Sequence, residues 1–383
     1  MSVAFTDPDA LILPAGPPSL DPRDRIWTMS RHVDVAAVLR SPAFRAAGVA
    51  ERIDRIASRA GRDYTDLLAL LRETMLFQND GKHARARSVV RLLVQRAQAE
   101  WTPAALRERA RRIVDGLPER GVSDVVPALA EPLPTRVLAA ALGLPPDQCA
   151  YLREQALTVT GAWLPGAAMR ELDGFEAAAG LLRAAMLPFN TAGSRIADLG
   201  TGDSDDEAAD LAAFLLIAGA DTIAGTVAAA LDLLARHRDW QPRLRQDPSL
   251  MPGFIRETLR LAGPLRRLNR RIAVDAIDIG GAAIAPGDMI VLQIDRAHRD
   301  PDAFPDPEHI DPSRKGAALL AFGGGAHICQ GPLIGALEVE AMVGAAVERF
   351  AFAPTTERGH LLAHADWRVF TRLPLALEPA PPA

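Results

Sequence analysis

Cys329 is one of two cysteines in the chain, and it lies in the stretch "FGGGAHICQG", from Phe322 to Gly331. Three consecutive glycines precede it, and glycine allows backbone angles and close approaches that side chains forbid. The loop can therefore turn its amide hydrogens toward the sulfur, and a helix predicted to begin at Pro332 would point its positive end at the same atom. Both effects favour the thiolate, which suits a single-thiolate metal ligand or a nucleophile. Taken alone, a buried packing cysteine remains the commoner alternative.

Two phosphate-binding interpretations of the same glycines fail. A P-loop needs a Lys-Ser or Lys-Thr pair where its helix begins, and Pro332-Leu333 stand there instead. A dinucleotide-binding fingerprint fails as well, because Ile328 occupies the place of its third glycine.

The stretch "AGADT", from Ala218 to Thr222, is a second candidate for chemistry. Ala218 and Gly219 leave a shallow groove on one face of a predicted helix. Asp221 and Thr222 form an acid and alcohol pair that could relay protons into a buried pocket. The alternative is an Asp on the solvent face beside a tolerated Thr, and the sequence leaves both open.

Several basic side chains could clamp carboxylates. In "GKHARAR", His83 and Arg87 are four residues apart and so share one helical face. Glu257 and Arg260 are one turn apart in "RETLRL", a pair that many surface helices also carry. A solvated basic face is the alternative for His83 and Arg87. Further donors are His327 and the pair Arg270-Arg271.

Apolar spacing predicts that helices position most of these residues. Residues up to about Asp21 are expected to be extended, and residues 192–210 form the best loop candidate. A first helix is predicted from near Val33 to before Pro42. Most of the stretch from Pro103 to about Arg236 is predicted to be helical, and its longest periodic segment runs from near Asp205 to Arg236. Two further helices are predicted, from Phe254 to Leu261 and from Pro332 to about Phe350. The stretch from Ile277 to Asp295 alternates and carries Gly-Gly and Pro-Gly turns, which predicts strands joined by hairpins. The expected fold class is mainly α with a small β component, built as one domain over residues 1–383.

Composition excludes several classes of protein. Hydrophobic residues make up 49% and charged residues 24% of 383 residues, and the net charge is -5. Nucleic acid and anionic membranes are therefore not expected as partners. Two cysteines cannot build a disulfide framework or a Cys-rich zinc site. No secretory signal is recognised at the start, and the most apolar run is too short for a membrane span. A soluble cytoplasmic protein is expected.

Together and in this order, the motifs resemble the haem-thiolate monooxygenases of the cytochrome P450 superfamily, in their soluble bacterial form. The cysteine-loop pattern of that family is matched by Phe322, Gly323, Gly325, His327, Cys329 and Gly331. Its oxygen-activating helix pattern is matched by Ala218, Gly219, Asp221 and Thr222. Its Glu-x-x-Arg helix and its haem-clamping helix are matched by Glu257 and Arg260 and by His83 and Arg87. The similarity extends over almost the whole chain.

The resemblance implies that haem b lies between the long central helix and the cysteine-loop helix. Cys329 would be the axial ligand of the iron, and Phe322 would pack beside the sulfur. His83, Arg87, Arg271 and His327 would pair with the two propionates, with Arg270 as the competitor of Arg271. Ala218 and Gly219 would leave room for O₂. Thr222 would donate a hydrogen bond to the bound O₂, and Asp221 would link it to solvent protons.

The implied reaction is oxidation of a largely apolar small molecule, with electrons from an external donor, expected to be a ferredoxin with its reductase. The protein is expected to be monomeric. Desaturation or oxidative coupling, and a non-catalytic haem-binding partner protein, are the alternatives. The substrate is expected to lie near Leu265, Arg266, Arg267, Leu268, Asn269 and Trp163. One departure is His309, which stands where many relatives have an arginine that completes a buried network with the Glu and Arg.

Overall fold

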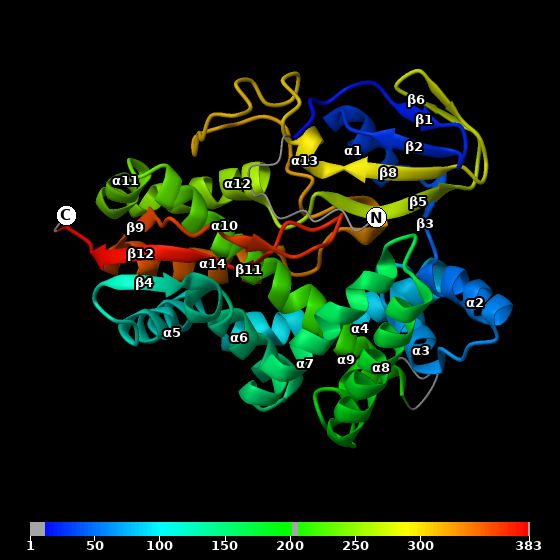
Figure 1. Ribbon diagram of the computed structural model, residues 1–383, viewed down its shortest axis with the longest axis horizontal. Coiled ribbons are helices and arrows are strands. Elements are labelled where there is room, and N and C mark those ends of the chain that lie inside the picture. Colours follow the sequence, from blue (N-terminus) through cyan, green and yellow to red (C-terminus); the bar gives the residue numbers. More distant parts are fainter. Residues whose placement is uncertain (1–11, 201–205, 382–383) are drawn as a thin grey trace. The chain divides into compact units, whose positions relative to one another are not determined.

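The computed structural model describes residues 12–200 and 206–381 (Figure 1). Its backbone contacts divide the chain into two interleaved compact units. The first unit comprises Met1–Phe44, Trp101–Pro134 and Thr222–Ala383, and the second comprises Arg45–Glu100 and Thr135–Asp221.

The first unit combines helices with most of the strands. Its early elements are β1 (Ser19–Asp21), β2 (Ile26–Met29), α1 (His32–Arg40), the start of β3 (Phe44–Ala46), α5 (Pro103–Asp115), β4 (Gly121–Asp124), the π-turn η1 (Val126–Ala130) and the start of α6 (Pro132–Leu142). Its central elements are α10 (Thr222–Arg236), α11 (Trp240–Gln246), η6 (Pro248–Leu250), α12 (Met251–Ala262), β5 (Arg267–Ala273), β6 (Ile277–Ile279), β7 (Ala282–Ile284), β8 (Met289–Gln293) and α13 (Ile294–Ala297). Its last elements are η7 (Gly325–His327), α14 (Pro332–Arg349), β9 (Phe350–Pro354), β10 (His360–Leu361), β11 (Phe370–Arg372) and β12 (Pro374–Pro379).

The second unit is almost entirely helical in the part that the structure describes, and it also contains the remainder of β3 and of α6. Its elements are α2 (Val49–Ala60), α3 (Thr65–Glu73), α4 (Asp80–Glu100), α7 (Pro146–Val159), η2 (Thr160–Trp163), α8 (Met169–Met186), η3 (Leu187–Phe189), η4 (Ala197–Leu199), α9 (Glu207–Leu216) and the π-turn η5 (Ile217–Asp221). The predicted helix start near Asp205 lies outside the described residues, and α9 begins at Glu207. The predicted boundaries of α1, α12 and α14 agree with the structure to within a few residues.

The main sheet has the strand order β1-β2-β8-β5-β3. Strand β8 runs parallel to β2 and antiparallel to β5, whose register shifts between Leu268 and Arg271. An apolar cluster that includes Val35, Leu39, Ile290 and Leu292 lies between this sheet and α1, and it is fully or almost fully buried. The smaller sheets are β4-β12-β9, β6-β7 and β10-β11.

The prediction of hairpins in residues 277–295 is correct for the Gly-Gly turn and wrong for the Pro-Gly turn. Strands β6 and β7 pair as a hairpin, but β7 and β8 belong to different sheets. The reason is Asp288, whose buried carboxylate accepts hydrogen bonds from the amide of Ala285 and from Nε1 of Trp27 on β2, both at 3.0 Å. These bonds direct the chain to β2 instead of back along β7.

The longest predicted helix is interrupted. The helical stretch Glu207–Arg236 contains the π-turn η5 between α9 and α10. By length and composition it is the one helix in the described residues that could cross a membrane, yet 78% of its apolar window is buried within the protein. Burial of this kind is typical of the core helix of a globular protein.

Candidate active site

The glycines of the cysteine loop are required by close packing. Gly323 and Gly325 have φ angles of 70° and 60°, which are left-handed values that favour glycine. A Cβ atom on Gly325 would lie 2.2 Å from the carbonyl oxygen of Leu39, and one on Gly324 would lie 3.2 Å from the Leu39 side chain. The loop is therefore fixed against the last turn of α1 by contacts that only glycine permits.

Two hydrogen bonds position Cys329 in its loop, immediately before α14. The amide of Cys329 donates to the carbonyl oxygen of Phe322 at 2.9 Å, and the amide of Gly331 donates to Cys329 Sγ at 3.4 Å. Helix α14 begins immediately afterwards at Pro332, as predicted. The alternative of a buried packing cysteine is wrong for Cys329, which is exposed; it describes Cys149 instead, where burial raises the thiol pKa to about 11.

Glu257 and Arg260 form a buried ion pair, so the alternative of a surface pair is wrong. Both residues are 1% exposed, and the guanidinium contacts both carboxylate oxygens at 2.8 and 2.9 Å. Burial alone would raise the pKa of Glu257. The hydrogen bonds from Arg260 and from the amide of Asp311, with the charge of Arg314, reverse that effect and hold the pKa below its usual value.

Arg314 is a member of this network that the sequence analysis missed. Its Nε lies 3.2 Å from Oε2 of Glu257, and its Nη2 donates to the carbonyl oxygen of His309 at 3.0 Å. The side chain of His309 is exposed, and His309 contributes its backbone carbonyl, which also accepts from Arg260 at 3.1 Å. Many relatives have an arginine at the position of His309, and in this chain Arg314, five residues later, contacts Glu257 instead. A turn in which Asp311 accepts a hydrogen bond from the amide of Ser313 places Arg314 there.

Arg271 is a buried cation without a buried anion. It is 6% exposed, donates to the carbonyl oxygen of Asn269 at 3.2 Å, and forms no ion pair with any residue that the structure describes. Burial lowers its pKa to about 10. Arg270, its competitor for a propionate, instead contacts the carboxylate of Asp366 at 3.3 Å. A buried guanidinium of this kind needs a negative group, and a haem propionate fits that requirement.

The second unit holds four further predicted cofactor residues, His83, Arg87, Ala218 and Gly219. On α4, His83 is buried and Arg87 is half-buried, so a fully solvated face is the wrong description of this pair. In the π-turn η5, Ala218 and Gly219 are half-buried, and a Cβ on Gly219 would lie 3.2 Å from the side chain of Leu138. Single π-turns inside helices are rare and occur often at functional sites.

Asp221, the last residue of η5, is buried rather than solvent-facing. It is 2% exposed, and its Oδ1 lies 3.0 Å from Nη1 of Arg153 on α7. No sequence pattern indicates Arg153 as this partner, because 68 residues separate the two side chains. Thr222 follows at the start of α10 and is half-buried.

Comparison with known proteins decides the family. The family model "Cytochrome P450" matches residues 197–376. The monooxygenase PikC of Streptomyces venezuelae is 31% identical over 346 residues, which cover 85% of this chain and 78% of the relative. This chain is a cytochrome P450. Nocardicin C N-oxygenase of Nocardia uniformis subsp. tsuyamanensis is 30% identical and is matched over 91% of both chains.

Solved structures agree with this assignment. P450BioI, in complex with an acyl carrier protein that bears hexadec-9Z-enoic acid, superposes with a TM-score of 0.82 at 24% identity over 92% of each chain. The epothilone B-bound P450epoK superposes with a TM-score of 0.77 at 26% identity, over 95% of this chain and 94% of that one. The protein therefore has the P450 fold, mainly α with small sheets. It is an oxidoreductase of the haem-thiolate monooxygenase class with haem b as its cofactor.

The residues predicted to meet the substrate of this P450 differ in their surroundings. Arg266 lies 3.3 Å from Asp295, and Leu268 packs against the apolar cluster beneath the main sheet. The side chain of Arg267 is 31% exposed, donates to Gln293 at 3.3 Å and lies 3.7 Å from Asp366. The other two predicted substrate residues of the first unit are Leu265 and Asn269. Leu265 forms an isolated antiparallel β-bridge with Trp367, and Asn269 is half-buried.

Trp163, the predicted substrate residue of the second unit, is 7% exposed. Its ring lies edge-on to that of Phe77, with 5.5 Å between the ring centroids. A donor nitrogen on a mostly apolar ring suits the wall of a pocket for apolar molecules. Its contact with substrate stays a prediction.

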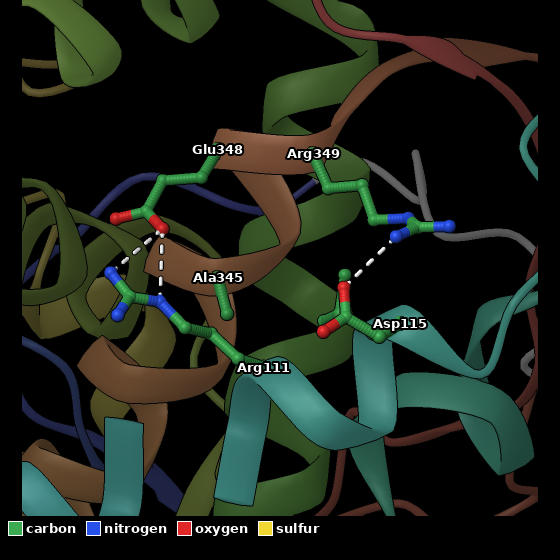
Figure 2. A pocket seen from close by; sticks show the side chains of 6 residues that line it. Arg111, Asp115, Ala345, Glu348 and Arg349 are labelled. Carbon is green, nitrogen blue, oxygen red and sulfur yellow. Dashed lines mark hydrogen bonds and ion pairs between the residues drawn. The ribbon is translucent and has the colours of Figure 1, made fainter. Parts of the chain in front are cut away.

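A separate hollow of about 230 Å³ lies between α5 and α14 (Figure 2). Two ion pairs cross it: Arg111 contacts Glu348 at 3.2 Å, and Arg349 contacts Asp115 at 2.9 Å. Its lining includes none of the predicted haem or substrate residues. Three of these four charged side chains are more than half exposed and that of Arg349 is 33% exposed, so each pair contributes little to stability.

Proposed function

We propose that this cytochrome P450 hydroxylates, or otherwise oxidises, a largely apolar small molecule that carries an anionic group. The printed names of its relatives support the apolar part, since they include a steroid C26-monooxygenase and a beta-dihydromenaquinone-9 omega-hydroxylase, both from Mycobacterium tuberculosis. The observation that carries the anionic part is the state of three neighbouring arginines in the first unit, Arg266 just before β5 and Arg267 and Arg270 within it.

Among those arginines, Arg267 is the one most able to receive a ligand. Arg266 and Arg270 each have a carboxylate partner at 3.3 Å, whereas Arg267 is 31% exposed and lies 3.7 Å from Asp366, a carboxylate that Arg270 already contacts. A guanidinium with weak internal pairing can bind a carboxylate through two parallel hydrogen bonds. Arg267 is therefore the proposed anchor of the substrate's anionic group.

The remaining site residues take the following proposed roles. Cys329 binds the iron through its thiolate, and the Gly331 amide hydrogen bond together with the positive end of α14 stabilises that charge. Phe322 packs beside the sulfur, with Gly323 and Gly331 shaping the loop. Propionates are bound by Arg271, His327, His83 and Arg87. When bound, haem supplies the activation of O₂, for which a thiolate ligand favours cleavage of the O–O bond.

Proton supply is the proposed task of Asp221 and Thr222. The Thr222 hydroxyl donates a hydrogen bond toward the oxygen being reduced, while Ala218 and Gly219 leave space on the same helix. Asp221 transfers protons from solvent to Thr222, because a carboxylate can accept and release a proton within hydrogen-bond reach of a hydroxyl. Neither role requires a metal ligand other than Cys329.

Electrons are proposed to come from a ferredoxin and its reductase, docking on the side of the molecule that bears Cys329. One catalytic domain over residues 1–383, a monomeric state and a cytoplasmic location complete the proposal. Coverage of 92% of this chain by a single P450 structure supports one catalytic domain.

Two measurements test these proposals. The reduced carbonyl complex should show the Soret band of a thiolate-ligated haem, and Cys329→Ser should abolish it; an unchanged band would refute the axial assignment. For the substrate, spin-state shifts are titrated with a long-chain fatty acid and its methyl ester. Arg267→Ala should weaken binding of the acid by about five- to ten-fold, equivalent to roughly 1–1.4 kcal/mol, and leave the ester unaffected. Equal effects on both ligands would exclude Arg267 as the anion anchor.

A further inference from the structure

One carboxylate of the first unit, that of Asp366, contacts two arginines of β5. Its Oδ2 lies 3.3 Å from Nη1 of Arg270, and its Oδ1 lies 3.7 Å from Nη1 of Arg267. The side chains of Asp366 and Arg270 are 12% and 16% exposed, and that of Arg267 is 31% exposed. Two guanidinium groups therefore share one carboxylate, and the three side chains together carry one positive charge in excess.

An irregularity in β5 allows both arginines to reach the same carboxylate. Residues three apart on a regular strand face opposite sides of the sheet. The pairing of β5 with β8 shifts register between Leu268 and Arg271, and an irregularity of this kind redirects nearby side chains. The backbone of Asp366 is fixed beside the strand, because its carbonyl oxygen accepts from the amides of Arg266 and Arg267 at 2.9 and 3.2 Å.

The two contacts of Asp366 differ in strength. Oδ2 accepts a hydrogen bond from Arg270, whereas Oδ1 is buried and accepts none from the residues that the structure describes. Arg267 is loosely held as well, since its other contact is a hydrogen bond of 3.3 Å from Nε to Oε1 of Gln293. A buried carboxylate oxygen without a hydrogen bond is costly, so Oδ1 attracts Arg267 whenever no ligand occupies that guanidinium.

We propose that Asp366 is a specificity-determining residue of the substrate site, which limits the anionic group of the substrate to a single negative charge. Arg270 neutralises Asp366, and Arg267 is left to pair with one carboxylate of the substrate. A dianion such as a phosphate monoester would bring its second charge close to the carboxylate of Asp366, which repels it. The inference rests on the proposed role of Arg267 as the anion anchor, and it names monocarboxylates as the class of substrate.

Three ligands of equal chain length test this proposal. Dodecanoate, dodecyl phosphate and methyl dodecanoate are titrated into the holoenzyme by calorimetry at slightly alkaline pH, where a phosphate monoester carries close to two negative charges. Asp366→Asn raises the excess from one positive charge to two. This variant should bind dodecyl phosphate about ten-fold more tightly and dodecanoate at most about three-fold more tightly, and it should leave the ester unaffected.

Removal of Arg270 should act in the opposite direction. In Arg270→Met, both oxygens of Asp366 can pair with Arg267, and no excess charge remains. Binding of dodecanoate should weaken by about five-fold although Arg267 itself is intact. The double variant Arg270→Met with Asp366→Asn again has one excess positive charge and should bind dodecanoate within about two-fold of the wild type. This recovery distinguishes an effect of charge from damage to the fold.

Asp295→Asn is the matched control. It removes a carboxylate that is 15% exposed and lies 3.3 Å from the neighbouring Arg266, so the net charge of the protein changes as in Asp366→Asn. It should alter the preference between phosphate and carboxylate by less than about three-fold. The proposal is overturned by equal shifts of this preference in Asp295→Asn and Asp366→Asn, or by unchanged dodecanoate binding in Arg270→Met.

Arg267→Ala separates this failure from failure of the proposed anion anchor. If Arg267→Ala weakens dodecanoate binding while the Asp366 and Arg270 variants keep the wild-type preference, the anchor stands and the role of Asp366 is refuted. If Arg267→Ala leaves dodecanoate binding unchanged, the anchor is refuted, and the role of Asp366 with it.

Discussion

Replacement of Arg314 by Met should destabilise the protein, whereas replacement of His309 by Ala should not. Arg314 is 10% exposed at its side chain and contacts a Glu257 carboxylate that is 2% exposed. Its other donors reach the carbonyl oxygens of Pro305, Asp306 and His309, which lie near solvent and can accept from water instead. The ion pair with Glu257 therefore accounts for most of the expected loss.

The magnitude follows from that geometry. A buried hydrogen bond to a charged group contributes about 1.5–3 kcal/mol, and loss of a whole buried pair costs about 3–5 kcal/mol. Glu257 keeps Arg260 in the Arg314→Met variant, so the expected loss is about 2–3 kcal/mol in the free energy of unfolding. His309→Ala removes an exposed side chain and should change it by less than about 0.5 kcal/mol.

The same effect should depend on pH. The folded state holds the pKa of Glu257 below its usual value, so the ionised carboxylate stabilises the fold above the unfolded pKa of about 4.3, and this stabilisation disappears as the pH falls through the lower folded value. The difference between wild type and Arg314→Met should be full near neutral pH and shrink in acid. Urea unfolding followed by circular dichroism and by loss of the Soret band measures both. Equal midpoints for the Arg314 and His309 variants at neutral pH would refute the reasoning.

Two further predictions concern the haem side of the first unit. Arg271→Met should speed transfer of haem to apomyoglobin by about ten-fold or more, since a hydrogen bond to a charged group contributes roughly 1.5–3 kcal/mol. Arg270→Met should change the transfer rate by less than about three-fold, because Arg270 is paired with Asp366. Similar rates for both variants would contradict the assignment of Arg271 to a propionate. Gly325→Ala should lower haem content after expression and destabilise the fold by more than about 1 kcal/mol, because it combines a positive φ with a contact of 2.2 Å to the backbone. Gly344→Ala on α14, where a new Cβ meets nothing within 4 Å, is its control and should be neutral or stabilising.

The sequence by itself determined the cysteine loop, the helix that follows it and the family. Short-range patterns carry part of this information, since Pro332 marks a helix start that depends on neighbouring residues alone. The glycines before Cys329 are visible in the sequence as well, although the close contact that requires Gly325 is made with the distant Leu39. The relative PikC, at 31% identity, is a cytochrome P450 monooxygenase, which agrees with the family expected from the residues.

The tertiary structure decided how the charged side chains are paired, because each pair joins residues that are distant or irregularly spaced in the chain. Arg153 reaches Asp221 across 68 residues, and Arg314 reaches Glu257 across 57. The proposed choice of Arg271 over Arg270 as the propionate contact also rests on burial and pairing, because Arg271 is 6% exposed whereas Arg270 contacts Asp366. Neighbouring residues on a strand face opposite sides, and the register shift of β5 lies between Leu268 and Arg271. Spacing along a sequence shows which groups are present, but only the packing of the chain removes water from them, and the loss of water determines which charges need a partner.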